Sequence, residues 1–142
     1  MAVTGNKEVV IEADPAAVLD VLSDVEALPS WSPVHKKVEI VDRTEDGKPY
    51  RVKMAVSILG INDDQVVEYT WSDTKVTWDL VEGSQQKAQH GEYTLTPTDE
   101  GTHVAFELTV DLKIPVPGFL VRRGTKTTLE TATEGLRQQV VG

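Results

Sequence analysis

Hydrophobic and polar residues alternate along most of the middle of the chain, which is the pattern of β-strands that bury one face. The clearest run is residues 51–58, in which every second residue is large and apolar. Similar runs cover Val67–Trp71, Val76–Leu80, Gln89–Leu95 and Val104–Leu112, and weaker ones cover residues 7–12 and 34–40. Short turns separate most of these runs, and short connections join antiparallel neighbours. The pattern therefore predicts a meander of about seven antiparallel strands.

The predicted helices lie towards the two ends of the chain. Asp14 precedes Pro15 after the first strand, and an aspartate N-cap followed by proline is typical of a helix start. A second short helix or turn is predicted over residues 24–30. Residues 117–140 contain no proline after the first position, so they predict one long helix. Its inner face consists of residues that recur every three or four positions, namely Gly118, Val121, Thr125, Leu129, Ala132, Leu136 and Val140.

The inner face of the long helix has an unusual composition, because its middle is small and partly hydroxylated. Gly124 and Thr125 are both weak helix formers, which indicates a bend or a close approach by another group. Opposite a sheet that carries large aromatic residues, such small side chains would leave a space. The pattern predicts a ligand cavity between the helix and the sheet. The alternative is a helix whose short side chains simply pack close to the sheet.

Charge and composition exclude several classes of function. The 142 residues carry a net charge of −9, whereas nucleic acids and anionic membrane surfaces require a basic patch. The chain has no cysteine, which rules out disulfides, thiolate metal sites and cysteine catalysis. No signal peptide is apparent, and no apolar run approaches the ~20 residues of a membrane span. We therefore expect a single cytoplasmic domain over residues 1–142, a monomer or weak dimer, without a nucleic-acid partner or stable membrane insertion.

Four segments carry a resemblance to a known family: Val9–Asp24, Leu28–Pro33, Gly91–Leu95 and Gly101–Val104. With the predicted order of elements, they make the chain similar to the START-like (SRPBCC) superfamily, and within it to the polyketide cyclase/dehydrase and lipid transport proteins. The resemblance implies an α+β helix-grip fold. In that fold a curved antiparallel sheet, two short N-terminal helices and a long C-terminal helix surround a cavity. No catalytic motif can be transferred, because the family includes both cyclases and carriers.

Few residues with catalytic or metal-binding chemistry are predicted to face the cavity. By strand parity, His35, His90 and His103 lie opposite the apolar residues of their strands, so we expect all three to face solvent, far from the cavity. Neither a convergent set of metal ligands nor a phosphate-binding glycine loop is apparent. The sequence therefore predicts no metal and no cofactor, and it leaves any catalytic residues unknown.

The predicted cavity lining is mainly apolar and aromatic, with a few polar groups. It consists of Trp31, Met54, Val56, Ile58, Gln65, Tyr69, Trp78, Leu80, Gln89, Tyr93, Phe106, Leu108, Arg122, Thr125, Leu129, Ala132 and Leu136. A mostly apolar pocket with few polar groups is typical of a small-molecule site. Tyrosine and glutamine side chains can hold a ketone, quinone or hydroxyl oxygen without ionising. We expect the mouth of the cavity where residues 59–61 meet Pro115, Val116 and Phe119.

Three functions are compatible with this pattern. The first is the binding or transport of a hydrophobic small molecule, such as a lipid, an isoprenoid quinone or a polyketide. The second is a polyketide cyclase or dehydratase that orients its substrate and uses Tyr69, Tyr93 or Arg122 for proton transfer. An inward ionisable group with a strongly shifted pKa would favour the second. The third is a protein-interaction domain, which would require a large exposed apolar patch.

Overall fold

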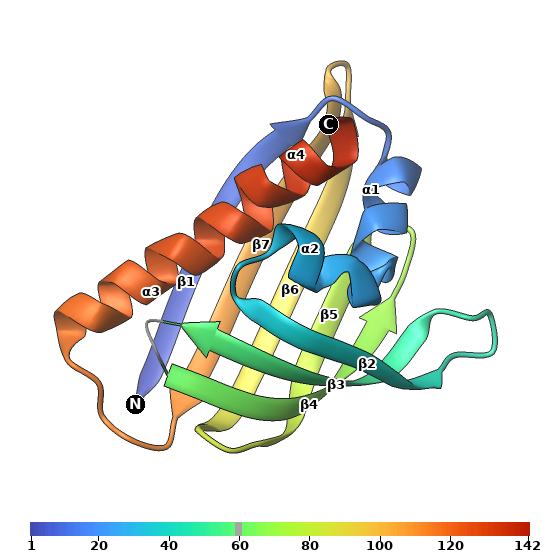
Figure 1. The fold of residues 1–142 in the computed structure, drawn as a ribbon. Helices are drawn as coiled ribbons and strands as arrows, with labels where there is room; N and C mark the ends of the chain where they lie inside the picture. The colour runs from blue at the N-terminus through green and yellow to red at the C-terminus, as the bar shows by residue number, and fades with distance from the viewer. Residues whose placement is uncertain (59–60) are drawn as a thin grey trace.

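The computed structural model describes residues 1–58 and 61–142, with Ile58 described by its backbone alone. Within these residues, seven strands form one sheet in the order β1-β7-β6-β5-β4-β3-β2, and all neighbours are antiparallel (Figure 1). The strands are β1 Ala2–Ile11, β2 His35–Arg43, β3 Pro49–Ile58, β4 Ile61–Trp71, β5 Lys75–Gly83, β6 Gln86–Thr98 and β7 Gly101–Leu112. The predicted antiparallel sheet is confirmed. β1 is longer than predicted and pairs along its whole length with β7.

The helices also lie where the sequence predicts them. They are α1 Pro15–Ser23, the 3-10 helix η1 Val25–Ala27, α2 Leu28–Trp31, α3 Gly118–Glu130, the π-helical turn η2 Thr131–Gly135 and α4 Leu136–Val141. The carboxylate of Asp14 accepts a hydrogen bond of 3.0 Å from the backbone N–H of Ala17, which confirms the predicted N-cap. In the part of the chain that the structure describes, no helix is both long and apolar enough to cross a membrane.

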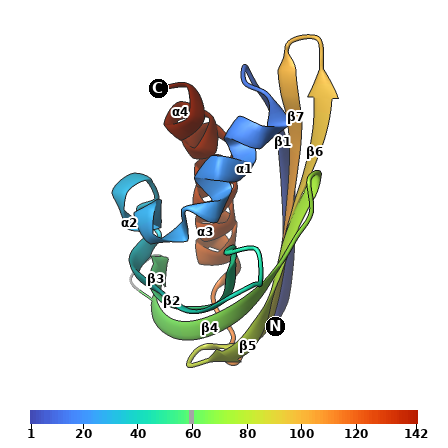
Figure 2. The same cartoon turned by 90° about the vertical axis from the view of Figure 1, so that its right-hand side faces the viewer.

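The sheet curls around the C-terminal helix, and Figure 2 shows all the helices on the same, concave side. Arg137 of α4 donates two hydrogen bonds, of 3.0 and 2.8 Å, to the Glu12 carboxylate, and this contact fixes α4 beside the end of β1. The side chains around this end of the helix are fully buried: Ile11, Val18, Leu95, Val104 and Leu136. The end of the fold near α4 is thus a packed core. The free space lies further along the sheet, beside α2, α3 and the π turn.

At Gly124–Thr125 the sequence indicated a bend or a close approach by another group, and the structure shows the close approach: a Cβ atom on Gly5 of β1 would lie 2.9 Å from Thr125 Cγ2. The irregular part of the C-terminal helix is instead the π turn η2. Both Gly124 and Thr125 lie inside the regular helix α3. In η2 the Thr133 hydroxyl donates to the backbone oxygen of Leu129 at 2.7 Å. The Tyr93 hydroxyl, from β6, donates to the backbone oxygen of Ala132 at 2.9 Å. A π turn disturbs the regular backbone hydrogen bonding of a helix, and here a sheet residue supplies one donor to it.

Register shifts interrupt several of the strand pairs, and two of them, in β2 and β6, change which side chains face the cavities. In β2, His35 pairs with Val56 and Lys37 pairs with Ala55, so that Lys36 is one extra residue. In β6, Gln86 pairs with Leu112 and Ala88 pairs with Asp111, so that Lys87 is extra. An extra residue reverses the alternation of faces beyond it. Both bulges therefore affect residues at the start of a strand.

Candidate functional site

Two cavities lie between the concave side of the sheet and the helices. The first, which we call the α3 cavity, has a volume of about 130 Å³ and lies between α3 and strands β1, β4 and β7. Its walls include Val3, Gly5, Val121, Gly124, Thr125 and Leu129. The second, which we call the aromatic cavity, has a volume of about 120 Å³ and extends from α2 to the π turn. Its walls include Trp31, Met54, Tyr69, Trp78, Tyr93, Phe106 and Ala132.

The two cavities adjoin each other, because five residues line both of them. These shared residues are Val56, Gln86, Leu108, Val110 and Thr128. Four of them are small or aliphatic, and only Gln86 has an amide. We call the junction formed by these five shared residues the waist. A molecule that filled both cavities would pass these residues.

A cluster of stacked and tilted aromatic rings forms the sheet side of the aromatic cavity. The ring centroids of Tyr69 and Trp78 are 5.6 Å apart, those of Trp78 and Phe106 are 6.0 Å apart, and those of Tyr93 and Phe106 are 4.7 Å apart. Trp78 lies over Gly91 of the neighbouring strand, its cross-strand partner. A Cβ atom on Gly91 would lie 2.1 Å from the indole ring, so only glycine leaves room for this arrangement. The aromatic wall therefore depends on one glycine.

A series of hydrogen-bonded, uncharged side chains runs from the aromatic wall to a buried carboxylate. The Trp78 indole N–H donates to Gln89 Oε1 at 2.8 Å, and Gln89 Nε2 donates to Gln65 Oε1 at 3.2 Å. Gln65 Nε2 in turn donates to Asp63 Oδ2 at 3.1 Å. The other oxygen of Asp63 accepts from the Ser84 hydroxyl and from the backbone N–H of Gln85, both at 2.7 Å. Each side chain of this series therefore has hydrogen-bond partners, as buried polar groups require.

His35 faces the aromatic cavity, so the prediction that all three histidines lie far from the cavity is wrong for this residue. The bulge at Lys36 places His35 opposite Val56, on the inward face, whereas strand parity had placed it with Lys37 and Glu39. The hydroxyl of Ser32, a residue that is only 2% exposed, lies 2.7 Å from His35 Nδ1. Burial lowers the pKa of His35 to about 4, because the charged imidazolium is poorly solvated there. The side chain is neutral at pH 7.

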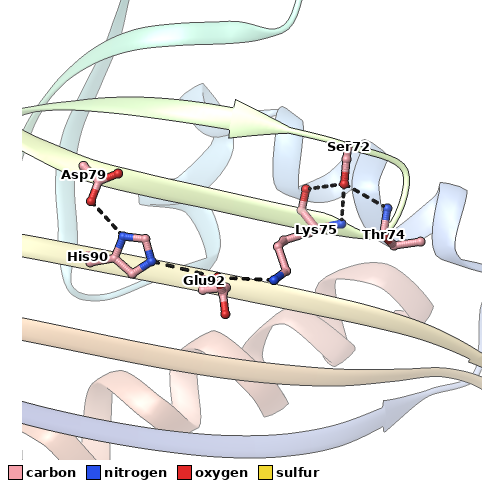
Figure 3. A network of polar contacts seen from close by, with 6 residues as sticks. All are labelled: Ser72, Thr74, Lys75, Asp79, His90 and Glu92. Atoms are coloured by element: carbon pink, nitrogen blue, oxygen red, sulfur yellow. Dashed lines mark hydrogen bonds and ion pairs between the residues drawn. The ribbon is translucent and has the colours of Figure 1, made fainter.

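The other two histidines are on the outer face of the sheet, as predicted. His90 Nδ1 lies 2.7 Å from an Asp79 oxygen. The other ring nitrogen of His90 faces the Glu92 carboxylate, which in turn pairs with the Lys75 ammonium group at 3.5 Å. Figure 3 shows this network on the side of the sheet that faces away from the helices. The network is a set of surface contacts between neighbouring strands and has no access to the cavities.

His103, from β7, is the third histidine, and its Nε2 lies 3.5 Å from the Glu8 carboxylate on the same outer face. Among the described residues, no group of three histidine, aspartate or glutamate side chains is arranged to hold a metal ion.

The two tyrosines of the aromatic cavity differ in what their hydroxyls contact. Burial raises the pKa of both Tyr69 and Tyr93 well above the usual range. The hydroxyl of Tyr93 already donates to the backbone oxygen of Ala132. That of Tyr69 has no hydrogen-bond partner among the described residues, although the side chain is 8% exposed and lines the cavity. Tyr69 is therefore the tyrosine whose hydroxyl can reach a bound molecule.

Most residues that the sequence places in the cavity lie in one of the two walls. Trp31, Met54, Gln65, Tyr69, Trp78, Gln89, Tyr93, Phe106 and Ala132 line the aromatic cavity, Thr125 and Leu129 line the α3 cavity, and Val56 and Leu108 line both. The side chain of Ile58 and residues 59–60 of the predicted mouth lie outside the described residues. Of the other mouth residues, Ile61 and Val116 line the α3 cavity, and Phe119 is 60% exposed.

Three predicted lining residues lie elsewhere. Leu136 is completely buried in the packed core near α4, where no space remains. Leu80 packs against the edge of the core and lines neither cavity. Arg122 is exposed and borders a surface groove between α3 and β1, because it is one position, or about 100° of helix, beyond the inward-facing Val121. The two cavities thus contain no cationic side chain from α3.

Several polar residues that line the cavities were missed by the sequence analysis, among them Asp63, Gln86 and His35. Asp63 has the same strand parity as Gln65 and Tyr69, so the alternation of β4 contained the signal for it. Gln86 lies beyond the bulge at Lys87, and His35 lies beside the bulge at Lys36. One extra residue leaves no mark in an alternating pattern, so strand parity assigned His35 to the wrong face and gave no reason to place Gln86 in the cavity.

Comparison with known proteins agrees with this architecture. The family model described as polyketide cyclase/dehydrase and lipid transport matches residues 2–141. The chain belongs to this family. No sequence among curated proteins matches it. A START superfamily protein of Mycobacterium smegmatis is 26% identical, with a TM-score of 0.82 over 98% of this chain and 96% of that one.

Two further solved structures extend the comparison. A protein from Thermus thermophilus is 25% identical, with a TM-score of 0.77 over 99% of this chain and 97% of that one. The ZhuI aromatase/cyclase of a Streptomyces species has a TM-score of 0.78 over 99% of this chain and 94% of that one, at 15% identity. The last similarity shows the shared fold alone. Both family and fold are compatible with hydrophobic ligand binding and with cyclase chemistry.

Proposed function

We propose that this protein binds or carries a hydrophobic small molecule, such as a lipid, an isoprenoid quinone or a polyketide, in the two adjoining cavities. The observation that carries the proposal is the pair of largely apolar spaces of about 130 and 120 Å³ that share five wall residues. A dry apolar cavity of roughly 150 Å³ is enough to bind benzene. Each cavity is therefore close to the size of one six-membered ring, and the protein retains this space instead of packing it.

The remaining parts of the proposal concern the setting in which the protein acts. A net charge of −9 disfavours nucleic acid as a partner, and the absence of cysteine suits a reducing compartment. We propose a cytoplasmic monomer or weak dimer whose partner is the hydrophobic ligand itself.

A cyclase or dehydratase is the second candidate, and the position of His35 favours it. This is an ionisable group with a strongly lowered pKa in the wall of the aromatic cavity, and such groups concentrate at functional sites. The neutral imidazole could accept a proton from a bound substrate. However, a pKa of about 4 makes it a weak base at neutral pH, and general bases work best with a pKa near the working pH. For this reason binding is the primary proposal.

The proposal predicts a specific effect of filling the aromatic cavity from the helix side. Ala132→Trp should weaken binding of the apolar fluorophore N-phenyl-1-naphthylamine by roughly tenfold or more, since the indole would occupy the space of about 120 Å³. The variant should lose less than about 1 kcal/mol of stability, because the new side chain enters a void. Fluorescence titration and urea unfolding measure the two quantities.

Thr127→Trp is the matched control, because Thr127 lies on the exposed face of the same helix. This variant should bind the fluorophore as the wild type does. A wild type that binds no fluorophore, together with an Ala132→Trp variant destabilised by about 1–3 kcal/mol, would show a solid core and contradict the proposal.

A further inference from the structure

The series of hydrogen bonds behind the aromatic cavity has a fixed direction, because its two ends are different in kind. At one end the indole of Trp78 can only donate, so the oxygen of Gln89 must face it. At the other end the Asp63 carboxylate accepts, so the nitrogen of Gln65 must face it. The oxygen of Gln65 then faces the nitrogen of Gln89, at 3.2 Å. The two ends therefore agree: in both Gln89 and Gln65 the amide oxygen faces the Trp78 side of the series, and the amide nitrogen faces the Asp63 side.

This direction determines which end of Gln86 is available to a ligand. Gln89 Nε2 also donates to Gln86 Oε1, at 2.6 Å, so the oxygen of the Gln86 amide is occupied. The Gln86 Nε2 group has no acceptor among the described residues. Yet the residue is only 8% exposed and lines both cavities at the waist. Two N–H donors are therefore available at the junction of two largely apolar spaces, where a bound molecule with an acceptor oxygen could pair with them.

We propose that Gln86 selects ligands in which two ring-sized apolar parts are joined at or near a hydrogen-bond acceptor oxygen, such as a ketone or quinone carbonyl. The size of each part follows from the cavity volumes, and the position of the oxygen follows from the waist. The inference rests on the proposed function, because it assigns a chemical class to the molecule bound in the same cavities. A ligand whose central group is a hydrocarbon leaves the donors of Gln86 unpaired. A site built to donate hydrogen bonds discriminates against such analogues.

The inference can be tested with two ligands that differ at the waist alone. Benzophenone has two phenyl rings joined by a carbonyl, and diphenylmethane has the same rings joined by a methylene. We expect the wild type to bind benzophenone roughly tenfold more tightly than diphenylmethane, which is the effect of one neutral hydrogen bond. Isothermal titration calorimetry of the full chain measures both dissociation constants.

Gln86→Glu removes both donors while it retains the shape of the side chain and an oxygen that can accept from Gln89. In this variant the ratio of the two dissociation constants should fall to about one or reverse. Gln86→Leu, which has no polar group, should give a ratio of about one as well. Gln139→Glu makes the same chemical change on the exposed face of α4 and should keep the wild-type ratio. Circular dichroism melting of each variant establishes that it is folded.

The possible outcomes separate this inference from the proposed function. A wild-type ratio near ten that is lost in Gln86→Glu and Gln86→Leu but kept in Gln139→Glu supports the inference. Equal binding of both ligands by the wild type, or a preference for benzophenone that persists in both Gln86 variants, overturns the inference and leaves the proposed function intact. Failure of the wild type to bind either ligand overturns the proposed function, and the inference with it.

Discussion

Gly91→Ala should lower the free energy of unfolding by about 3 kcal/mol, at the upper end of the range for overpacked cores. A Cβ atom at this position would lie 2.1 Å from two atoms of the Trp78 indole ring and 2.7 Å from a third. The ring has to move away from β6, and it cannot then keep its 2.8 Å hydrogen bond to Gln89. We expect the same variant to bind apolar ligands poorly, because Trp78 forms part of the cavity wall. Urea unfolding and ligand titration measure the two effects.

Gly135→Ala provides a control with the same chemical change and the opposite expected sign. Gly135 has helical backbone angles, with φ −62° and ψ −43°, and its new Cβ would be at least 3.6 Å from its neighbours. Alanine is favoured over glycine inside a helix by roughly 0.5–1 kcal/mol, so this variant should be slightly more stable than the wild type. If Gly91→Ala were as stable as the wild type, the packing of Trp78 against β6 would be contradicted.

The second large effect concerns the pH dependence that His35 gives to stability. The pKa of His35 is about 4 in the folded protein, against an ordinary value of 6.5. Between these values the unfolded chain binds a proton that the folded protein does not, so stability falls as the pH falls. The contribution is fully present above pH 6.5 and is lost as the pH drops through about 4. With 1.36 kcal/mol per pKa unit, its full size is on the order of 3 kcal/mol.

His35→Gln isolates this contribution, because glutamine does not titrate. The difference in unfolding free energy between wild type and variant should shift by that amount between pH 7 and pH 4, in the direction that favours the variant at low pH. Urea unfolding at a series of pH values measures the difference. A difference that is constant across this range would mean that the His35 side chain is well solvated and does not belong to the cavity wall.

The alternation of hydrophobic residues predicted the sheet well, because most strands keep a strict two-residue period against one buried face. Met54 and Val56 on β3, and Val67 and Tyr69 on β4, all face inward as their parity predicts. The long helix was also predictable, since its inward face repeats every three or four residues. These features follow from local rules that the sequence expresses directly.

The polar part of the site depends on features that the sequence does not express locally. A single extra residue in β2 and another in β6 turn His35 and Gln86 towards the cavities. Sequence parity cannot reveal where such a bulge lies, because it is set by pairing with the neighbouring strand. Similarly, Leu136 has the right helical spacing for a cavity residue, but the end of the helix near α4 is closely packed. Packing along the helix axis is a tertiary property.

We propose above that one apolar molecule occupies the two adjoining cavities between the helices and the concave side of the sheet. Isotope-filtered NMR with unlabelled diphenylmethane and methyl-labelled protein tests it most directly. We expect nuclear Overhauser contacts from the ligand rings to the methyl groups of Val56, Leu108 and Ala132, which line the two cavities. Contacts confined to exposed residues such as Val41, Val81 and Ile114, each about half exposed, would contradict the claim.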